Sequence, residues 1–365
     1  MKRRTFLLQS ALAAGAAATL GGCTREMIEG KGSAALARRK KVTLKIATSW
    51  PANFPIMGTG VDRFAERVRA MSGGSLVIKV YPKNILVPAL AVFDATASGQ
   101  IDGFHSGPYY WKGKNPAFAL FSGLPLGMTA AELVGWMRYG GGYDLWRELY
   151  ARHNLYPFMG GNTGVQMGGW FRKPIESLAD LKGLKMRIPG LGGEVMAKLG
   201  VNPILLPAGE IYTALERGTI DATEWVGPAL DIRMGFYKVA PNYYTGWHEP
   251  GSVLELTFNK ARFDRLADEH KAILAEAATA LNTEMYHEFM DQNARALEKL
   301  KALHVTIRHF PPDVIEAAKK AIADVVAEQS ERSADFKKVY ASMADYYRLV
   351  RPWTDLSEGH YLQIR

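Results

Sequence analysis

Cysteine is nearly absent from this chain of 365 residues, in which Cys23 is the only one. A single cysteine excludes an internal disulfide and any metal site made of several thiolates. Long apolar runs are also few, because none after the first segment reaches the roughly 18 residues that a membrane-spanning helix needs. The remaining composition, 48% hydrophobic and 22% charged, is typical of a globular protein with a sizeable core.

The chain also lacks a concentrated positive charge outside its N-terminus. Its formal net charge is +9, but eight basic and two acidic residues precede Lys41, so that segment supplies +6 and the rest only +3. Proteins that bind nucleic acid carry a clustered basic face. We therefore expect no nucleic-acid partner.

Established catalytic motifs are missing as well. The sequence contains neither the G-x-S-x-G pattern of a nucleophile elbow nor the H-E-x-x-H pattern of a zinc peptidase. The stretch GLGG at 190–193 lacks the full G-x-G-x-x-G spacing of a dinucleotide loop. These absences favour a binding protein over an enzyme.

The N-terminal 40 residues resemble an export signal followed by a flexible tether. A basic head is followed by an apolar stretch over 5–20, and Arg3-Arg4 before Thr5-Phe6-Leu7 resembles a twin-arginine signal. An ordinary secretory signal is the alternative. Cys23 follows Leu-Gly-Gly, as in a bacterial lipobox, so it is either lipidated or part of a removed signal. Both interpretations predict export to the periplasm.

Strand and helix patterns alternate twice along the rest of the chain. Val42, Leu44 and Ile46 alternate as in a strand, a helical pattern follows, and residues 75–82 predict a second strand. The alternation of strands and helices begins again with a strand at 184–188 and short helices at 192–200 and 208–218. Alternating strands and helices predict parallel sheets covered by helices, and hence an α/β fold.

A repeated phrase indicates that this α/β fold has two similar lobes. GQIDGFHSGP at 99–108 and GTIDATEWVGP at 218–228 share Gly-x-Ile-Asp and a closing Gly-Pro. In both, we expect a helix to end at the glycine and a strand to begin at Ile-Asp. The residues that follow then lie at the carboxyl end of the strand, where α/β sheets bind ligands. Unrelated lobes with a chance match are the alternative.

These patterns predict a two-lobed periplasmic binding protein with a ligand cleft between its lobes. Residues 1–40 form the signal and tether, 41–160 lobe I, completed by about 250–310, and 161–249 lobe II. Such lobes close on their ligand by a hinge motion. The remaining helical pattern, 311–365, exceeds what a lobe needs, so we expect its helices between about Pro312 and Val350 to form a homodimer.

Four stretches carry a family resemblance that covers nearly the whole chain after Lys41. They are GNTGVQMGGWFRKPI, DLKGLKMRIPGLGGEVMAKLG, GTIDATEWVGP and GWHEPGS. Together they resemble the solute-binding proteins of TRAP transporters (DctP type), and within them the TakP-like subgroup, which binds α-keto acids. The resemblance implies a receptor that captures a small 2-oxo or 2-hydroxy acid. It also implies a homodimer and delivery to the small and large membrane subunits of the permease.

Arg187 resembles the arginine that holds the carboxylate of the acid in this family. Its planar guanidinium can bind a carboxylate through two parallel hydrogen bonds. The predicted strand ends just after it, and residues 190–193 lead into a helix N-terminus that also favours an anion. A surface ion pair is the alternative role for this arginine.

Glu224 resembles a ligand of the cation that these proteins bind with the acid. A glutamate in the cleft would repel an acid substrate unless a bound Na⁺ or Ca²⁺ neutralised it. Gln166 offers an amide oxygen to that cation or an amide donor to the acid. Trp225 offers its backbone carbonyl to the metal and its ring to the ligand, unless it is a core tryptophan.

Glu249 departs from the family pattern, which has a neutral amide in this region. A second carboxylate favours a divalent hard cation, so Glu249 joins the predicted metal ligands and Ca²⁺ is favoured over Na⁺. Tyr110 and Asn162 are lesser candidates for contact with the acid, and either is equally compatible with a structural role.

The first copy of the repeated phrase contributes an apolar candidate. We expect Phe104 to cover the tail of the acid when the cleft closes. His105 and His248 are more typical of packed, hydrogen-bonded histidines than of metal ligands. The rival function is a cation-dependent enzyme that acts on a small keto acid, and the site residues alone leave that alternative open.

Overall fold

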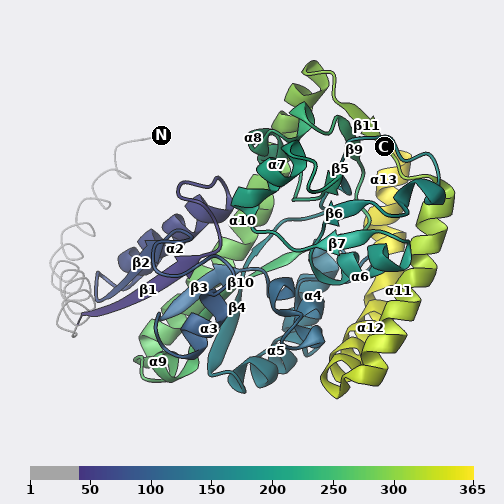
Figure 1. Cartoon of the computed structure of the whole chain (residues 1–365). Helices are drawn as coiled ribbons and strands as arrows, with labels where there is room; N and C mark the ends of the chain where they lie inside the picture. Colours follow the sequence, from purple (N-terminus) through teal and green to yellow (C-terminus); the bar gives the residue numbers. More distant parts are fainter. Residues whose placement is uncertain (1–40) are drawn as a thin grey trace, which may run out of the picture.

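The computed structural model describes residues 41–365, so the predicted signal, tether and Cys23 lie outside the described residues (Figure 1). Two mixed sheets organise the rest of the chain. The first has the order β2-β1-β3-β10-β4 and the second the order β11-β9-β5-β8-β6-β7. Each sheet is the centre of one lobe, as the alternation of strands and helices predicted.

The first lobe contains five strands and the helices that cover them. Its strands are β1 (Val42–Thr48), β2 (Leu76–Tyr81), β3 (Gly103–Ser106), β4 (Leu155–Asn162) and β10 (Val253–Asn259). Its helices are α2 (Met57–Met71), α3 (Val92–Ala97), η1 (Pro108–Trp111), η2 (Pro116–Phe121), α4 (Ala130–Tyr139), α5 (Gly142–Ala151) and α9 (Lys260–Asp264). In α2, the helical spacing of Val61, Phe64 and Val68 places all three in the core.

The second lobe contains short strands and short helices. Its strands are β5 (Gly169–Phe171), β6 (Lys185–Arg187), β7 (Asn202–Ile204), β8 (Ala222–Thr223), β9 (Asn242–Tyr244) and β11 (Thr306–Arg308). Its helices are η3 (Leu178–Leu181), α6 (Gly190–Lys198), α7 (Ala208–Glu216), α8 (Pro228–Met234) and η4 (Phe236–Lys238). One strand departs from the predicted division: β11 falls within 250–310, yet it pairs with β9 in the second sheet, because the chain has returned to this lobe by residue 306.

The two sheets share one plan of strand order and direction. In the first lobe β1 lies between its parallel neighbours β2 and β3, and β3 pairs antiparallel with β10. In the second lobe β6 lies between its parallel neighbours β7 and β8, and β8 pairs antiparallel with β5. The Gly-x-Ile-Asp part of the repeated phrase therefore occupies the same place in both lobes, just before β3 and just before β8.

The phrase has the same hydrogen bonds in both lobes. Asp102 donates its N–H to the carbonyl of Lys45 and accepts the N–H of Lys45 on its carboxylate. Asp221 makes the same two bonds with Lys185. Both strands therefore begin two residues later than predicted, because the aspartates tie the turn to the neighbouring strand before the ladder starts.

Three links connect the lobes. Residues 163–168 run from β4 to β5, and residues 245–252 run back from β9 to β10. The third is α10 (Asp268–Ala302), whose 35 residues span about 52 Å at 1.5 Å each. It packs against α2 and β4 in the first lobe and against α8 in the second, so it lies behind both lobes (Figure 1).

The C-terminal helices lie together along one side of the molecule (Figure 1). They are α11 (Pro312–Arg332), α12 (Ala334–Thr354), a π-helical turn (Asp355–Gly359) and α13 (His360–Ile364). The first of them packs on α6 of the second lobe, whereas α12 packs on η2, α4 and α5 of the first. Within residues 41–365, no helix is long and apolar enough to cross a membrane.

Candidate functional site

Arg187 ends β6 and is almost fully buried between the lobes, with 1% of its side chain exposed. Its Nη1 donates to the carboxylate Oε1 and to the backbone carbonyl of Glu224. Its Nε donates to the carbonyl of Leu206 at 3.2 Å. Its Nη2 donates only to the hydroxyl of Tyr110 in the first lobe, across a long 3.4 Å. The least engaged edge of the guanidinium therefore faces the other lobe.

Glu224 follows β8 directly and is as buried as Arg187, with 1% exposed. While Oε1 accepts from Arg187, Oε2 lies 3.2 Å from Nε2 of His248. The pairing of β6 with β8 in parallel register places the two strand ends, and hence the two opposite charges, beside each other. The predicted alternative of a surface ion pair is wrong, because the pair is buried.

A buried ion pair of this kind is costly to keep for stability alone. Removing both charges from water costs several kcal/mol each, and well-packed apolar residues often replace such a pair without loss. Burial lowers the pKa of Arg187, but Glu224, Tyr110 and Tyr109 together outweigh it, so the net effect raises the pKa. Perturbed, buried charges in a cleft are typical of functional sites.

Gln166 and Glu249 come together on the two segments that cross between the lobes. The N–H of Gln166 donates to the carbonyl of Glu249 at 2.9 Å, and the N–H of Thr163 donates to the carbonyl of Ser252. Two residues that are far apart in the chain are therefore neighbours at the hinge. The Gln166 side chain is buried and donates its amide to the Thr163 hydroxyl.

The Glu249 carboxyl is buried and electrostatically stressed. Burial raises its pKa to about 7, opposed by His248 and assisted by the negative charge of Glu224. Its Oε2 is buried and has no hydrogen-bond partner among the residues that the structure describes. A buried carboxylate oxygen without a donor costs free energy, which a bound cation or donor would recover.

Trp225 and Tyr110 complete the contacts around the ion pair. The guanidinium carbon of Arg187 lies 5.0 Å from the centroid of the Trp225 ring, a cation–π distance. The same ring meets Trp50 and Phe54 of the first lobe edge-on, at 6.4 and 6.3 Å between centroids. Trp225 is therefore a largely buried tryptophan that lies where the two lobes meet.

Asn162 lies at the end of β4, where the first crossing segment begins. Its amide donates to the carbonyl of Gly251 and its side-chain oxygen accepts the N–H of Gly164. These bonds hold the two crossing segments together. Its side chain thus has a structural role at the hinge, one of the two alternatives that the sequence left open.

Phe104 is not brought to this site, and its predicted role as a cover for the ligand is wrong. Its ring is fully buried against Phe93 of α3 and Trp111 of η1, in the core of the first lobe. The reason is the alternation of side chains along a strand. Phe104 in β3 corresponds to Thr223 in β8, one residue before the position of Glu224, so its side chain points to the opposite face. His105 is therefore the counterpart of Glu224.

His105 is a packed, hydrogen-bonded histidine, as the sequence indicated. Trp50 donates its indole N–H to Nδ1, so the proton of the neutral ring lies on Nε2, which donates to the carbonyl of Gly160. Burial lowers the pKa of His105 to about 4, so the ring is neutral at physiological pH.

The predicted cation ligands fit a hard metal ion in part. Glu224 and Glu249 supply buried carboxylates within electrostatic reach of each other, and Gln166 adjoins Glu249 through the backbone. Oxygen ligands of this kind suit Na⁺ and Ca²⁺. Within residues 41–365 no group of three His, Cys, Asp or Glu side chains is arranged to hold a metal. The remaining ligands would therefore be amide or carbonyl oxygens, such as those of Gln166 and Trp225.

Two residues of the site were missed as participants. His248 is a packed, hydrogen-bonded histidine, as the sequence indicated, but the sequence did not identify its partner, the Glu224 carboxylate. The position of His248 directly before Glu249, a predicted metal ligand, could have indicated that it lies in the site. Leu206 contributes only a backbone carbonyl to Arg187, and no side-chain pattern reveals such a contact.

Comparison with known proteins gives a consistent family assignment. Residues 46–333 match the family model of bacterial extracellular solute-binding proteins, family 7 (DctP). The chain is 39% identical to the monocarboxylate 2-oxoacid-binding periplasmic protein of Nostoc sp., over 99% of this chain and 98% of the relative.

Solved structures of TRAP periplasmic solute-binding proteins share the fold. One from Colwellia psychrerythraea, with bound calcium and pyruvate, is 46% identical and has a TM-score of 0.87, over 89% of this chain and 99% of its own. One from Pseudoalteromonas atlantica, with sodium and pyruvate, is 44% identical with a TM-score of 0.88, over 89% and 100%. A third, from Bordetella bronchiseptica, is a dimer with calcium and picolinate, 37% identical with a TM-score of 0.87, over 89% and 97%.

Proposed function

The chain belongs to the extracytoplasmic solute-binding proteins of TRAP transporters, and we propose that it captures a small 2-oxo or 2-hydroxy monocarboxylate together with a Na⁺ or Ca²⁺ ion. Members of this family are receptors and not enzymes, so the alternative of a keto-acid enzyme is set aside. The observation that carries the proposal is the buried Arg187–Glu224 pair between the lobes.

The ion pair suits a ligand that arrives as a cation and a carboxylate. The side chains of Arg187 and Glu224 neutralise each other. The acid's carboxylate would take the Nη2 edge of Arg187, which only Tyr110 contacts. The cation would take Glu224, with Gln166, Glu249 and the Trp225 carbonyl as further oxygen ligands. When the acid binds together with Na⁺, the net charge of the site does not change, because one negative and one positive charge are added. When it binds together with Ca²⁺, one positive charge remains, and an ionised Glu249 would balance it.

Calorimetric and thermal-shift titration tests this function directly. The mature protein is titrated with pyruvate in a chelator, in Na⁺ and in Ca²⁺, and we expect binding only when a cation is present. Ligand at 100 times its dissociation constant should raise the stability by about 2.7 kcal/mol. Glu224→Gln should weaken both the acid and the cation, because linked ligands lose affinity reciprocally. Normal pyruvate binding by Glu224→Gln without added cation would exclude the cation-bridged mechanism.

We also propose that the first 40 residues export the chain by the twin-arginine route and that Cys23 is lipidated. The support is the sequence pattern, since these residues lie outside those that the structure describes. Replacing Arg3 and Arg4 together with lysine should retain the precursor in the cytoplasm. Cys23→Ala should abolish labelling by radioactive palmitate, and unchanged labelling would contradict the lipid anchor.

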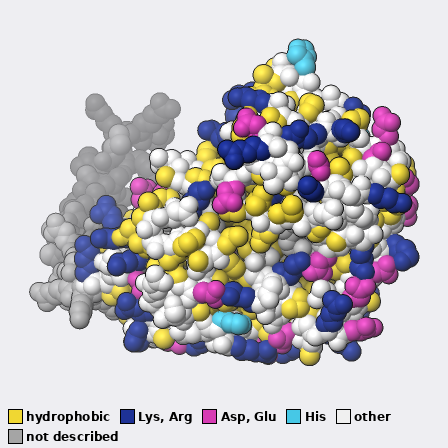
Figure 2. Space-filling model, in the orientation of Figure 1, with side chains coloured by type: hydrophobic (Ala, Val, Ile, Leu, Met, Phe, Trp, Pro, Cys, Tyr) yellow, Lys and Arg dark blue, Asp and Glu magenta, His cyan; other side chains and the backbone are white. Residues whose placement is uncertain are grey.

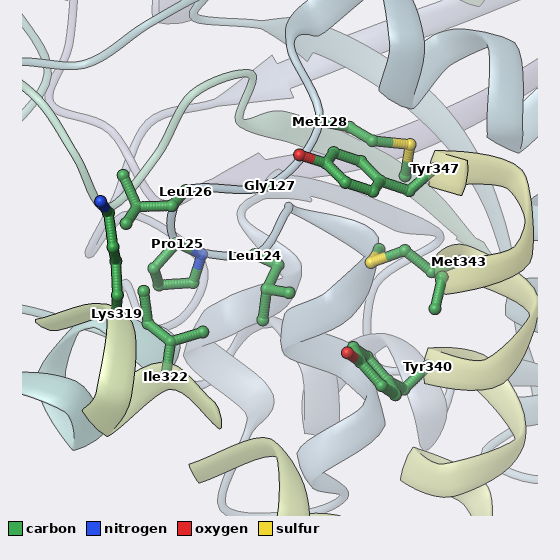
Figure 3. Close-up of a pocket in the computed structure, with 11 residues that line it drawn as sticks. Leu124, Pro125, Leu126, Gly127, Met128, Lys319, Ile322, Tyr340, Met343 and Tyr347 are labelled. Atoms are coloured by element: carbon green, nitrogen blue, oxygen red, sulfur yellow. The ribbon is translucent and has the colours of Figure 1, made fainter. Parts of the chain in front are cut away.

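The proposed partners are the TRAP membrane subunits and a second copy of the chain. A dimer is consistent with the Bordetella bronchiseptica structure and with the C-terminal helices, which expose Leu349, Trp353 and Leu356. An apolar pocket also opens between these helices and the loop over 124–128 (Figure 3). In Figure 3, Ile322 of α11 and Tyr340, Met343 and Tyr347 of α12 lie around that loop. Together they offer an apolar surface suited to a second copy.

A further inference from the structure

The carboxylate of Asp231, on α8, lies in the core of the second lobe with 1% of the residue exposed and accepts four hydrogen bonds. Its Oδ2 accepts the indole N–H of Trp170 at 2.9 Å and the hydroxyl of Tyr243 at 2.8 Å. Its Oδ1 accepts the backbone N–H of Val226 at 3.2 Å and that of Gly227 at 3.1 Å. One buried carboxylate therefore joins β5, β9 and the loop between β8 and α8.

That loop, residues 224–227, carries two of the proposed cation ligands, Glu224 and the carbonyl of Trp225. We call it the ligand loop. The Trp225 carbonyl and the Val226 N–H belong to one peptide unit, which is planar and trans, so they point in opposite directions. Because this N–H donates to Asp231, the Trp225 carbonyl points away from Asp231. The carboxylate of Asp231 thereby sets the direction of a proposed ligand that it does not touch.

The ligand loop is also tied to the hinge and to α10. The carbonyl of Val226 accepts the N–H of Met167 at 2.8 Å, and Met167 follows Gln166, a further proposed cation ligand, in the first crossing segment. At the start of α8, the N–H of Ala229 donates to the side-chain oxygen of Asn293 in α10 at 2.9 Å. The loop is therefore held by α8, by the first crossing segment and, through Ala229, by the helix that spans both lobes.

Asp231 also brings a negative charge close to the proposed cation ligands. Burial, and to a smaller extent the charge of Glu224, raises the pKa of Asp231 to about 7, against the hydrogen bonds that it accepts. A carboxylate that accepts a peptide N–H polarises that peptide and makes its carbonyl oxygen a better acceptor. Groups that hold metal ligands in this way orient them and raise their basicity.

On these observations, and resting on the proposed function, we propose that Asp231 is a positioning residue for the cation, which orients the Trp225 carbonyl and strengthens its hold on the ion. Asp231 does not contact the ligand itself. The acid's carboxylate goes to Arg187, which shares no hydrogen bond with Asp231. The effect of Asp231 therefore falls on the affinity for the cation rather than on that for the acid.

Asp231→Asn, with Glu255→Gln as the matched control, tests this inference. Each change replaces a buried carboxylate that accepts from an indole and a hydroxyl by its amide, but Glu255 lies in the first lobe, outside the site. Burial raises the pKa of both carboxyls to about 7, so the titrations are made at pH 8, where both are ionised.

The expected result is a selective loss of cation affinity. With pyruvate present, Asp231→Asn should bind Ca²⁺ about tenfold to a hundredfold more weakly than the wild type, and Glu255→Gln within about twofold of it. At saturating Ca²⁺, both variants should bind pyruvate within about threefold of the wild type, because the carboxylate site is untouched. Thermal unfolding of both variants shows that the fold is kept.

Two results would overturn the inference while leaving the proposed function intact. One is an unchanged Ca²⁺ affinity in Asp231→Asn. The other is an equal loss of pyruvate affinity at saturating Ca²⁺, which a general disturbance of the cleft would produce. Failure of the wild type to bind pyruvate with any cation would overturn the proposed function, and this inference with it.

Hydrogen exchange of the wild type is a second measurement, which needs no folded variant. It is made by NMR in a sodium-free buffer with a chelator. Because Asp231 holds the ligand loop before a cation binds, the N–H groups of Val226 and Gly227 should exchange about a hundredfold or more slower than in an unstructured peptide. Exchange at the peptide rate, with protection only after Ca²⁺ and pyruvate are added, would contradict the positioning role.

Discussion

At the scale of single residues, the site depends on one arginine whose charge is already compensated. Arg187 has a buried partner in Glu224 on one side, whereas Nη2, on the other side, has only the long bond to Tyr110. A ligand carboxylate therefore adds to this arrangement at an edge that is preorganised by Leu206 and by the ring of Trp225. Preorganised donors bind more tightly because little side-chain entropy is lost on binding.

Arg187→Ala is the direct test of this role. We expect it to weaken the acid by roughly 2–5 kcal/mol, the range for truncating one partner of a buried charge pair. The variant also leaves Glu224 buried without its counter-charge, so the apoprotein should lose stability and regain part of it when a cation is added. Calorimetry and thermal unfolding with and without Ca²⁺ measure both effects. An unchanged affinity for the acid would remove Arg187 from the site.

Glu255 provides a pH-dependent effect outside the site. It is buried in β10, where it accepts hydrogen bonds from Trp111 and Thr257. Burial raises its pKa from the ordinary 4.5 to about 7. The folded state therefore holds the proton more tightly than the unfolded state, and the contribution of Glu255 to stability falls as the pH rises from about 4.5 to about 7.

Glu255→Gln should remove that slope, because the amide does not titrate. Its single oxygen can keep the bond from Trp111, and its NH2 group can donate to the hydroxyl of Thr257. The free energy of unfolding of the wild type, relative to the variant, should fall by at most about 1.4 kcal/mol per pH unit in that window and be constant above it. Denaturant unfolding from pH 4.5 to 8 measures the difference. Parallel curves for the two proteins would show that Glu255 does not titrate there.

At the scale of elements, the repeated Gly-x-Ile-Asp phrase positions the strand that carries the site. Gly99 and Gly218 both have a positive φ, at 79° and 72°, which a residue with a side chain adopts poorly. The aspartate that follows ties the turn to the neighbouring strand in each lobe. In the second lobe that neighbour is β6, which ends at Arg187, and the next strand leads to Glu224.

Asp221→Ala and Asp102→Ala form a matched pair of tests. Asp102→Ala should lower stability by about 1–3 kcal/mol, because it leaves the part-buried N–H of Lys45 without its charged acceptor and removes the ion pair with Arg262. Asp221→Ala should cost less, because water can reach the exposed N–H of Lys185. Only Asp221→Ala should also weaken the acid, since only Asp221 is bonded to β6, the strand that ends at Arg187. Calorimetry with pyruvate and Ca²⁺ distinguishes them. Equal affinities in the two variants would mean that the turn supports the fold without positioning the site.

At the scale of the whole molecule, the binding site is made by the junction of two lobes and their hinge. Tyr110 and Trp50 come from the first lobe and Arg187 and Trp225 from the second. Both lobes also contact the C-terminal helices, because α11 packs on α6 and α12 on η2. On the face drawn in Figure 2, acidic and basic side chains are interspersed around apolar groups, without a single basic field.

The exposed apolar side chains of the C-terminal helices, Leu349, Trp353 and Leu356, predict a dimer that charged substitutions can break. The double variant Leu349→Asp, Trp353→Asp places charge in the proposed interface. The mass measured by light scattering should therefore fall from that of two mature chains to that of one. Met290→Asp is the control, because Met290 is similarly exposed on α10, away from those side chains. A monomeric wild type at micromolar concentration would refute the dimer.

The sequence by itself determined the features that depend on local spacing or on chemistry at one position. The α/β lobes followed from the periods of their apolar residues, and the equivalence of the two lobes followed from the repeated phrase. The chemistry of Arg187 and Glu224 as a carboxylate binder and a cation ligand was also proposed from the sequence, although their contact was not.

Tertiary structure alone decided which side chains meet. It placed Phe104 in the core, because a strand turns successive side chains to opposite faces and the packing of the first lobe decides which face is buried. It also returned β11 to the second sheet and paired Gln166 with Glu249 across the hinge. Such contacts depend on the register between strands and on where the chain crosses from one lobe to the other. The spacing of residues within one helix or strand predicts neither of them.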